Sequence, residues 1–190
     1  MLKNMQSYEL SFDDLAPCSV IRFESKVSMH YLDGKHFNEH DLRGQWGWFK
    51  RQIPSDQNFS NIGILNFMAV HRERQSQGLG RRSLHLAMFL MKKAGITVAF
   101  LEADPYINFI EDDILSDQLF KQREDFYISE GWVILDSYKP HPPRKHLWIN
   151  FEALQPIEPK SVIYQSVNDE VFDEHVNKSN LEGHIEGTGI

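Results

Sequence analysis

The 190-residue sequence contains a single cysteine, Cys18, so it can form neither an internal disulfide nor a metal site made of several thiolates. Its two richest apolar runs, at 62–70 and 84–91, are far shorter than the ~20 residues that a membrane span requires. The N-terminal residues contain no apolar segment of signal-peptide length. These absences predict a soluble, cytoplasmic protein.

Basic residues are fewer than acidic ones: 20 Lys and Arg stand against 27 Asp and Glu, which gives a formal net charge of −7. A negative field repels nucleic acids and anionic membranes, so neither is an expected partner. The apolar fraction of 41% excludes a wholly disordered chain and indicates a folded core. Any anion-binding site must therefore be a locally basic region of this acidic protein.

Hydrophobic patterning predicts an α/β chain. The expected strands cover residues 19–27, 46–53, 62–70, 96–105, 132–137 and 146–153, and the expected helices cover 78–94 and 113–130. A turn-rich stretch separates the strands 46–53 and 62–70, which predicts a hairpin between them. The helix 78–94 joins two strands that we expect to run parallel, and Gly95 is its expected end.

The C-terminal part of the chain has a different composition. Residues 161–190 hold six acidic residues and one Lys, with little periodicity after Phe172. We therefore expect one domain over 1–159, whose core ends near Leu154, and an acidic, weakly ordered tail over 160–190. An edge strand near the C-terminus would allow a homodimer.

One segment is basic in this acidic chain. Residues 71–82 (HRERQSQGLGRR) carry four Arg and one Glu. Gly78 and Gly80 lie where this loop becomes the helix 78–94, and glycines there let a ligand approach the backbone N–H groups closely. The helix dipole favours negative charge at the same place. The segment therefore predicts a binding site for a phosphate or pyrophosphate group.

The common nucleotide-binding motifs do not fit this loop. A P-loop requires a lysine that is absent here, and a dinucleotide fingerprint requires a third glycine where Ser83 stands. The pattern Gln/Arg-x-x-Gly-x-Gly/Ala does fit, as QSQGLG from Gln75 to Gly80, between the strand 62–70 and an apolar helix. In these residues the chain resembles the GNAT superfamily of N-acetyltransferases, whose acetyl-CoA-binding core has this order of elements.

A second pattern of the same superfamily lies downstream. Phe126 and Tyr127 precede Gly131 and Trp132 with the spacing (F/L)Y-x-x-x-G-(F/W). The two motifs occur in the order found in the superfamily, over residues 62–135. The resemblance implies a GNAT-type α/β (α+β) fold, a mixed, mostly antiparallel twisted sheet flanked by helices.

The resemblance also implies an enzyme, an acyltransferase that moves an acetyl group from acetyl-CoA, its co-substrate, to a primary amine by direct attack. It places the pyrophosphate at the glycine turn and the pantetheine arm along the end of strand 62–70, with the Val70 N–H polarising the thioester carbonyl. Arg74 and Arg82 are further candidates for phosphate contact by charge. The residues implied to bind acetyl-CoA are Met68, Ala69, Val70, Gln75, Ser76, Gln77, Gly78, Leu79, Gly80 and Arg81.

Acetyl transfer also needs proton transfers. The resemblance implies that Tyr127 protonates the CoA sulfur or donates a hydrogen bond to it. The superfamily's frequent acidic residue is absent from strand 62–70, so we choose a base by location: Glu102 first, with Asp104 and His71 as alternatives. The competing interpretations are a solvated carboxylate for Glu102 and a core aromatic for Tyr127.

Two alternative functions stay open at this stage. One is a GNAT-like transferase that uses a longer acyl donor, and the other is a catalytically silent module that binds CoA or a protein. Phe120 and Arg123 stand where the superfamily often has Asn and a small Ala, and this departure, with the acidic residue missing from strand 62–70, keeps the silent module open. No metal is expected, because His30, His36 and His40 have neither an HExxH pattern nor a cysteine beside them.

Overall fold

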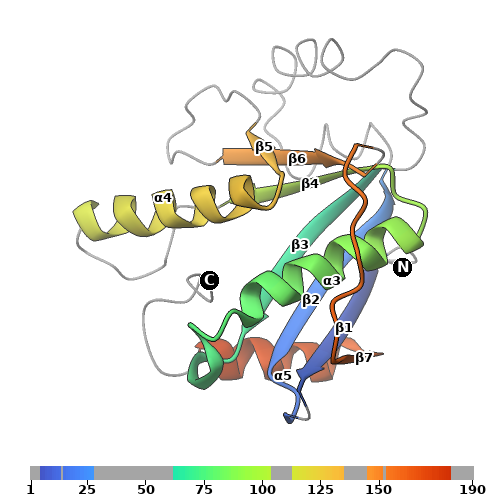
Figure 1. The fold of residues 1–190 in the computed structure, drawn as a ribbon. Coiled ribbons are helices and arrows are strands. Elements are labelled where there is room, and N and C mark those ends of the chain that lie inside the picture. Colours follow the sequence, from blue (N-terminus) through green and yellow to red (C-terminus); the bar gives the residue numbers. More distant parts are fainter. Residues whose placement is uncertain are drawn as a thin grey trace.

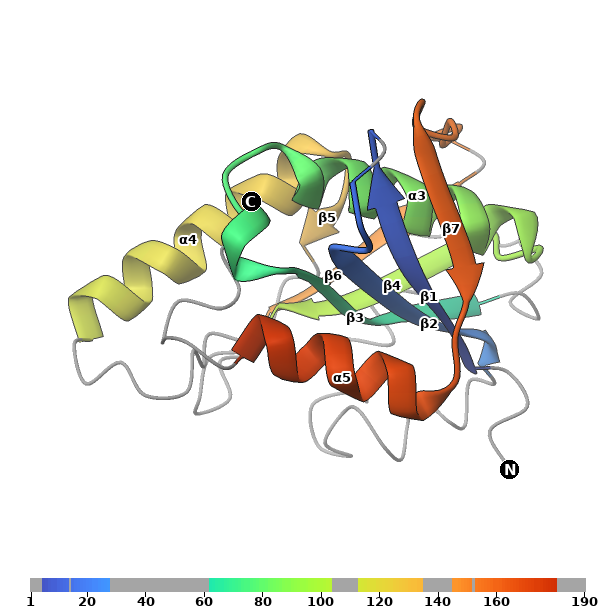
Figure 2. The same cartoon turned by 90° about the horizontal axis from the view of Figure 1, so that it is seen from below.

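The computed structural model of the protein describes residues 5–13, 15–27, 62–103, 113–134, 145–151 and 153–180. Its strands are β1 (Met5–Phe12), β2 (Ser19–Val27), β3 (Ile62–Val70), β4 (Val98–Ala103), β5 (Val133–Ile134), β6 (Lys145–Asn150) and β7 (Val162–Ser166). Its helices are the short 3₁₀ helix η2 (Arg72–Arg74), α3 (Leu79–Lys93), α4 (Asp113–Ser129) and α5 (Asp169–Asn180). Figures 1 and 2 show α3 and α5 on opposite faces of one sheet.

The strands of the described residues form one seven-stranded sheet in the order β5-β6-β4-β3-β2-β1-β7. Every neighbouring pair is antiparallel except β3 and β4, which run parallel with α3 as the connection between them. The predicted fold class and the predicted parallel unit are therefore confirmed. Residues 46–53, the other half of the predicted hairpin, lie outside the described residues, and β3 pairs with β2 and β4.

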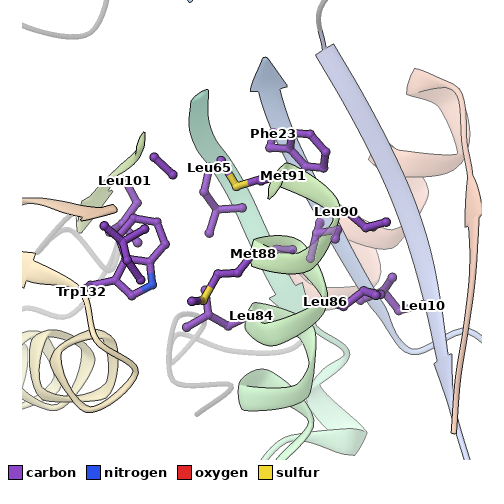
Figure 3. Close-up of a cluster of buried hydrophobic side chains, with 14 of the residues drawn as sticks. Leu10, Phe23, Leu65, Leu84, Leu86, Met88, Leu90, Met91, Leu101 and Trp132 are labelled. Carbon is purple, nitrogen blue, oxygen red and sulfur yellow. The ribbon is translucent and has the colours of Figure 1, made fainter. Parts of the chain in front are cut away.

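Helix α3 supplies the centre of the hydrophobic core. Its apolar side chains recur every three or four residues, which turns a wide stripe toward the sheet. In Figure 3, Leu86 points toward Leu10 of β1, whereas Leu84 and Met88 point toward Trp132, which follows α4. Each such side chain contributes about 1.5–3 kcal/mol when fully buried, so α3 is fixed firmly on the sheet.

The end of α3 is set by Gly95, as predicted. Gly95 has φ +86°, and its N–H donates to the Lys92 carbonyl at 2.9 Å, while the Ile96 N–H donates to the Met91 carbonyl at 3.1 Å. This pair of hydrogen bonds is a Schellman motif, which requires a left-handed residue that glycine adopts without strain. The chain then turns directly into β4.

The C-terminal residues correct the prediction of a weakly ordered tail. Strand β7 pairs antiparallel with β1, and α5 packs on the face opposite α3 through Phe172 (3% exposed) and His175 (6% exposed). Sheet and helix therefore continue well past Leu154, whereas residues 181–190 lie outside the described ones. The composition misled because the α5 segment is rich in acidic and polar residues, and one of the side chains that it buries, His175, is itself polar.

Candidate functional site

The parallel strands β3 and β4 separate part-way along their length. Their register runs from Ile62 opposite Val98 to Leu65 opposite Leu101 and ends there. The next residue, Asn66, is skipped in the pairing of β3 with β2, which makes it a β-bulge. A bulge bends and twists its strand, so Asn66 stands where β3 turns away from β4. We call this the β3–β4 divergence; Figure 1 shows the two strands spreading apart.

Beyond the bulge, β3 has a strand on one side only within the described residues. Met68, Ala69 and Val70 pair with β2, and no described strand lies on their other side. The His71 N–H donates to the Cys18 carbonyl at 2.7 Å, so His71 directs its backbone toward β2. Because successive residues of a strand alternate, Val70 and Met68 direct their N–H and C=O groups to the open edge.

The glycine turn follows at once. Gly78 is the N-cap of α3 with φ +74°, and Ser76 also has a positive φ, +59°. The first hydrogen bond within α3 runs from the Arg82 N–H to the Gly78 carbonyl. The N–H groups of Leu79, Gly80 and Arg81 therefore have no acceptor within the helix.

The space outside Gly78 suits a ligand. A Cβ atom placed on Gly78 would meet nothing within 4 Å. The first three N–H groups of α3 follow this open position directly, at the positive end of the helix dipole, and helix N-termini of this kind bind phosphate groups. Gly80, by contrast, is buried in the first turn of α3. The residues present fit a pyrophosphate at this turn.

The two arginines at the start of α3 have different surroundings. Arg81 forms an ion pair with Glu130, and its side chain is still 58% exposed. Arg82 pairs with Asp13, donates to the carbonyls of Lys160 (2.8 Å) and Ser161 (3.2 Å), and lowers the pKa of the Asp13 carboxyl. Arg82 thus joins α3 to the end of β1 and the start of β7.

Glu130 brings the two sequence motifs together. Its carboxylate accepts from Arg81 and also from His85 Nε2, both on α3. Glu130 follows the last residue of α4, Ser129, so the C-terminal end of α4 lies beside the first turns of α3. Residues 126–132 and the start of α3, which follows the glycine turn, are therefore neighbours in space.

The second motif has a structural role of its own. The N–H groups of Gly131 and Trp132 donate to the carbonyls of Ile128 (3.0 Å) and Tyr127 (3.1 Å), which makes a second Schellman motif. Gly131 takes the left-handed conformation that this motif needs, with φ +89°. The ring of Tyr127 packs edge-on against that of Trp132 at 6.2 Å.

The hydroxyl of Tyr127 lies in a partly buried setting. The side chain packs against the core, and burial raises the pKa of its hydroxyl. A phenol with a raised pKa keeps its proton at neutral pH. Tyr127 is therefore a packing residue whose hydroxyl is protonated at neutral pH.

Of the candidate bases, Glu102 lies on β4 one residue past the last β3–β4 pair, opposite His146 of β6. Asp104 lies outside the described residues, as do His30, His36 and His40. The remaining candidate, His71, directly follows Val70 at the end of the open edge.

His71 belongs to a partly buried chain of polar contacts that no pattern in the sequence indicates. His71 Nε2 lies 2.7 Å from His175 Nδ1 on α5, and the two rings stack with centroids 4.9 Å apart. His175 Nε2 lies 2.9 Å from Glu9 Oε2 on β1, and Gln165 Nε2 of β7 donates to Glu9 Oε1. We call this the Glu9–His175–His71 chain. It joins residues 166 positions apart, so no local pattern could reveal it.

Membrane-spanning helices and metal-binding clusters are both absent from the described ranges. No helix there is both long and apolar enough to cross a membrane. No group of three His, Cys, Asp or Glu residues there is arranged to hold a metal ion.

Comparison with models of protein families gives no match, and neither does comparison with curated protein sequences. Among solved structures, the chain is similar to a proposed acetyltransferase of Staphylococcus aureus Mu50, with 10% identity and a TM-score of 0.40, over 75% of this chain and 71% of that one. It is also similar to a proposed acetyltransferase of the GNAT family from Desulfovibrio desulfuricans, with 13% identity and a TM-score of 0.40, over 76% and 69% of the two chains.

Proposed function

We propose that this protein is an N-acetyltransferase that moves an acetyl group from acetyl-CoA to a primary amine by direct attack of the amine on the thioester. The observation that carries the proposal is the succession of two features along one segment. The open edge of β3 at Met68 and Val70 leads within ten residues to the turn at Gly78 that begins α3. The first feature can bind amides and the second can bind phosphates.

Acetyl-CoA has complementary parts. Its pantetheine arm carries two amides, which would pair with the open-edge backbone groups of Met68 and Val70, while Ala69 between them faces β2. Its pyrophosphate would accept hydrogen bonds at the turn and from the first N–H groups of α3. The backbone groups assigned to the pyrophosphate are those of Gln75, Ser76, Gln77, Gly78, Leu79, Gly80 and Arg81.

Two groups would then serve the chemistry. The Val70 N–H, directed to the open edge, would polarise the thioester carbonyl and stabilise the oxyanion that forms as the amine attacks. Tyr127, which keeps its proton because burial raises its pKa, would protonate the departing sulfur. Deprotonating a lysine-like amine at pH 7 costs about 4.6 kcal/mol, so a base is needed as well. By position on β4, Glu102 remains a candidate for that base.

Calorimetric titration of the protein tests which acyl donor it binds. We expect micromolar binding of acetyl-CoA and no binding of ATP, which lacks the pantetheine arm. Octanoyl-CoA binding much more tightly than acetyl-CoA would instead favour transfer of a longer acyl group. If no acyl-CoA binds, the glycine turn is only a structural loop and the proposal is wrong.

A matched pair of variants tests the location of the site. Gly78→Asn and Gly78→Asp put side chains of the same shape into space where a Cβ meets nothing within 4 Å, and both residues tolerate positive φ. Only Asp adds negative charge beside the proposed pyrophosphate. We expect Gly78→Asp to bind acetyl-CoA at least tenfold more weakly than Gly78→Asn. Equal affinities would place the pyrophosphate elsewhere.

A further inference from the structure

Glu24, on β2, has a buried carboxylate oxygen without a hydrogen-bond donor. The residue is 7% exposed, and no donor among the described residues reaches its Oε2. Most buried polar atoms in proteins are paired, and burial of a charged group without a partner costs free energy. An unpaired buried carboxylate that persists in a fold is therefore a candidate site for a ligand that supplies the missing donor.

The neighbouring cation on the same strand does not supply it. Arg22 lies two residues before Glu24, and its Nε donates to Ser7 Oγ of β1 at 2.8 Å. Its Nη2 donates to Asp169 Oδ1 at 2.7 Å, and its guanidinium lies over the Phe172 ring, 3.5 Å from the centroid. Arg22 is therefore held by β1 and α5, and Glu24 has no counter-ion among the described residues.

Glu24 lies on the face of the sheet that α3 does not cover. Arg22 contacts Phe172 of α5, which packs on the face opposite α3. Side chains two residues apart in a strand share a face, so Glu24 is on the α5 side as well. Helix α5 runs from Asp169, beside Arg22, toward η2. The helix therefore leads away from Glu24.

The register places Glu24 beside the β3–β4 divergence. Glu24 lies opposite Ile64 of β3, one residue before the last β3–β4 pair. Two residues beyond Ile64 is the bulge residue Asn66, whose Oδ1 is also enclosed without a donor. The Cα atoms of such diagonal neighbours on adjacent strands lie about 7–8 Å apart. Two buried oxygens close to the divergence therefore lack an N–H or O–H donor.

A cationic amine has the chemistry that this region lacks. An ammonium group carries three N–H donors, no acceptor, and a charge opposite to that of a carboxylate. The attraction between the two charges is stronger at a site removed from bulk water. The net charge of −7 on the whole chain also favours the approach of cations. A metal ion fits less well, because no group of three His, Cys, Asp or Glu in the described ranges is arranged to hold one.

Glu24 is too far from the proposed thioester position to contact the nitrogen that reacts there. Val70, whose N–H would polarise the thioester, lies opposite Ser19, and Ser19 is five residues from Glu24 along β2. At about 3.3 Å per residue, the two positions are about 17 Å apart. A cation at Glu24 would therefore be a second nitrogen of the acceptor, joined to the reacting one by an extended chain.

We propose that Glu24 binds a second cationic group of the acceptor, and that the acceptor is accordingly a diamine or a polyamine. The inference rests on the proposed acetyl transfer. The Glu24 carboxylate accepts a charge-assisted hydrogen bond from the distal ammonium, which leaves the primary amine at the other end of the chain to reach the thioester. Glu24 is a binding residue that selects the acceptor, and no bond forms or breaks at it.

The test compares Glu24→Gln with the native protein and with a matched control, Glu170→Gln. Glu170 is exposed at the start of α5, so its replacement removes the same charge at another place. Putrescine, spermidine and spermine offer two or more cationic groups at increasing separation, whereas butylamine and octylamine offer one. Amine binding is measured by calorimetry without acetyl-CoA, and turnover is measured as thiol release from acetyl-CoA.

We expect spermine to bind the native protein and Glu170→Gln equally well, and to bind Glu24→Gln about tenfold more weakly or worse, since a hydrogen bond between charged groups is lost. In turnover, the KM of Glu24→Gln for spermine should rise by a similar factor, with kcat and acetyl-CoA affinity within about twofold of native. Butylamine, which has no second cationic group, should react equally slowly with both proteins.

Thermal stability gives a readout that a structural role would not share. Glu24→Gln removes a buried charge that lacks a partner, so its melting temperature should equal or exceed that of the native protein. Spermine should raise the melting temperature of the native protein more than that of Glu24→Gln, because a ligand stabilises the folded state that binds it. A lower melting temperature for Glu24→Gln without ligand would assign Glu24 to the support of the fold and overturn the proposal.

The other outcomes separate this inference from the proposed function. If acetyl-CoA does not bind, the transferase and the acceptor role of Glu24 are both wrong. If acetyl-CoA binds and Glu24→Gln keeps the native KM for spermine, the transferase stands and Glu24 is not part of its acceptor site. Turnover of butylamine as efficient as that of spermine would show that no second cationic group is required, and would overturn the proposal as well.

Discussion

The hydroxyl oxygens of Ser19 and Ser83 lie 2.7 Å apart, although the two residues are 64 positions apart in the chain. Ser19 lies on β2 and Ser83 in the second turn of α3, and both are completely buried. Ser19 Oγ also contacts the Ala69 carbonyl at 2.8 Å, and Ser83 Oγ contacts the Leu79 carbonyl at 2.9 Å. This pair ties the start of α3, and with it the proposed phosphate site, to the open-edge segment of β3.

Replacing either serine should therefore loosen that connection. We expect Ser83→Ala to lower the free energy of unfolding by about 1–2 kcal/mol, since a buried hydrogen bond is lost. The double variant Ser19→Ala/Ser83→Ala should cost less than the sum of the two single variants, because they share one contact. Urea unfolding of all three variants measures the coupling. Strict additivity would mean that the two hydroxyls do not interact.

Tyr127→Phe separates the two roles of this residue. Phenylalanine keeps the ring that packs against Trp132, so the fold and acetyl-CoA affinity should be preserved. Loss of the hydroxyl removes the proposed acid, and we expect kcat to fall by about 10²-fold or more. Steady-state kinetics beside calorimetry give the comparison. Wild-type turnover would leave Tyr127 with a packing role alone.

Alkaline pH should destabilise the fold. Burial raises the pKa of Tyr127 and of Tyr8 above the ordinary value near 10, so the folded state holds these protons more tightly than the unfolded state. Their contribution to stability is fully present below pH about 10 and is lost as the pH rises through the folded-state pKa. Urea midpoints from pH 8 to 11 should fall, and less steeply in Tyr127→Phe. Parallel profiles for native protein and variant would exclude Tyr127 as a contributor.

Docking of α5 depends on one aromatic side chain. Phe172 is 3% exposed, packs edge-on against Phe67 at 5.4 Å, and lies under the Arg22 guanidinium at 3.5 Å. Phe172→Ala should lower the free energy of unfolding by about 3–5 kcal/mol. The control is Ile163→Thr on β7, a site 67% exposed, where a change within about 0.5 kcal/mol is expected. A loss below 1 kcal/mol for Phe172→Ala would contradict the docking.

The parts of the fold that could be predicted from sequence are those with strong local signals. The apolar stripe of α3, the glycine at position 95 and the β-rich segments on either side were sufficient to predict a parallel strand pair. The glycine turn and the Tyr127-x-x-x-Gly131-Trp132 spacing likewise pointed to the segments that Glu130 joins in space. In each case the residues that produce the signal lie close together in the sequence.

The remaining features depend on distant partners. Asn66 forms a bulge only because β2 pairs with the residues on either side of it. Nothing in the sequence around Asn66 marks it as the extra residue of a bulge. The chain from Glu9 to His71 needs β1, α5 and the end of β3 together, and the residue that α5 contributes to it, His175, is polar although it is buried. Composition alone therefore assigned the C-terminal residues to a tail.

The pairing of β7 with β1 has a consequence for biosynthesis. Glu9 precedes Gln165 and His175 by 156 and 166 residues in the order of synthesis. A nascent chain that stops at the end of β6 therefore carries the glycine turn without the polar partners of Glu9. On the proposed function, such a chain already has both features proposed to bind acetyl-CoA, whereas β1 still lacks the strand that later pairs with it.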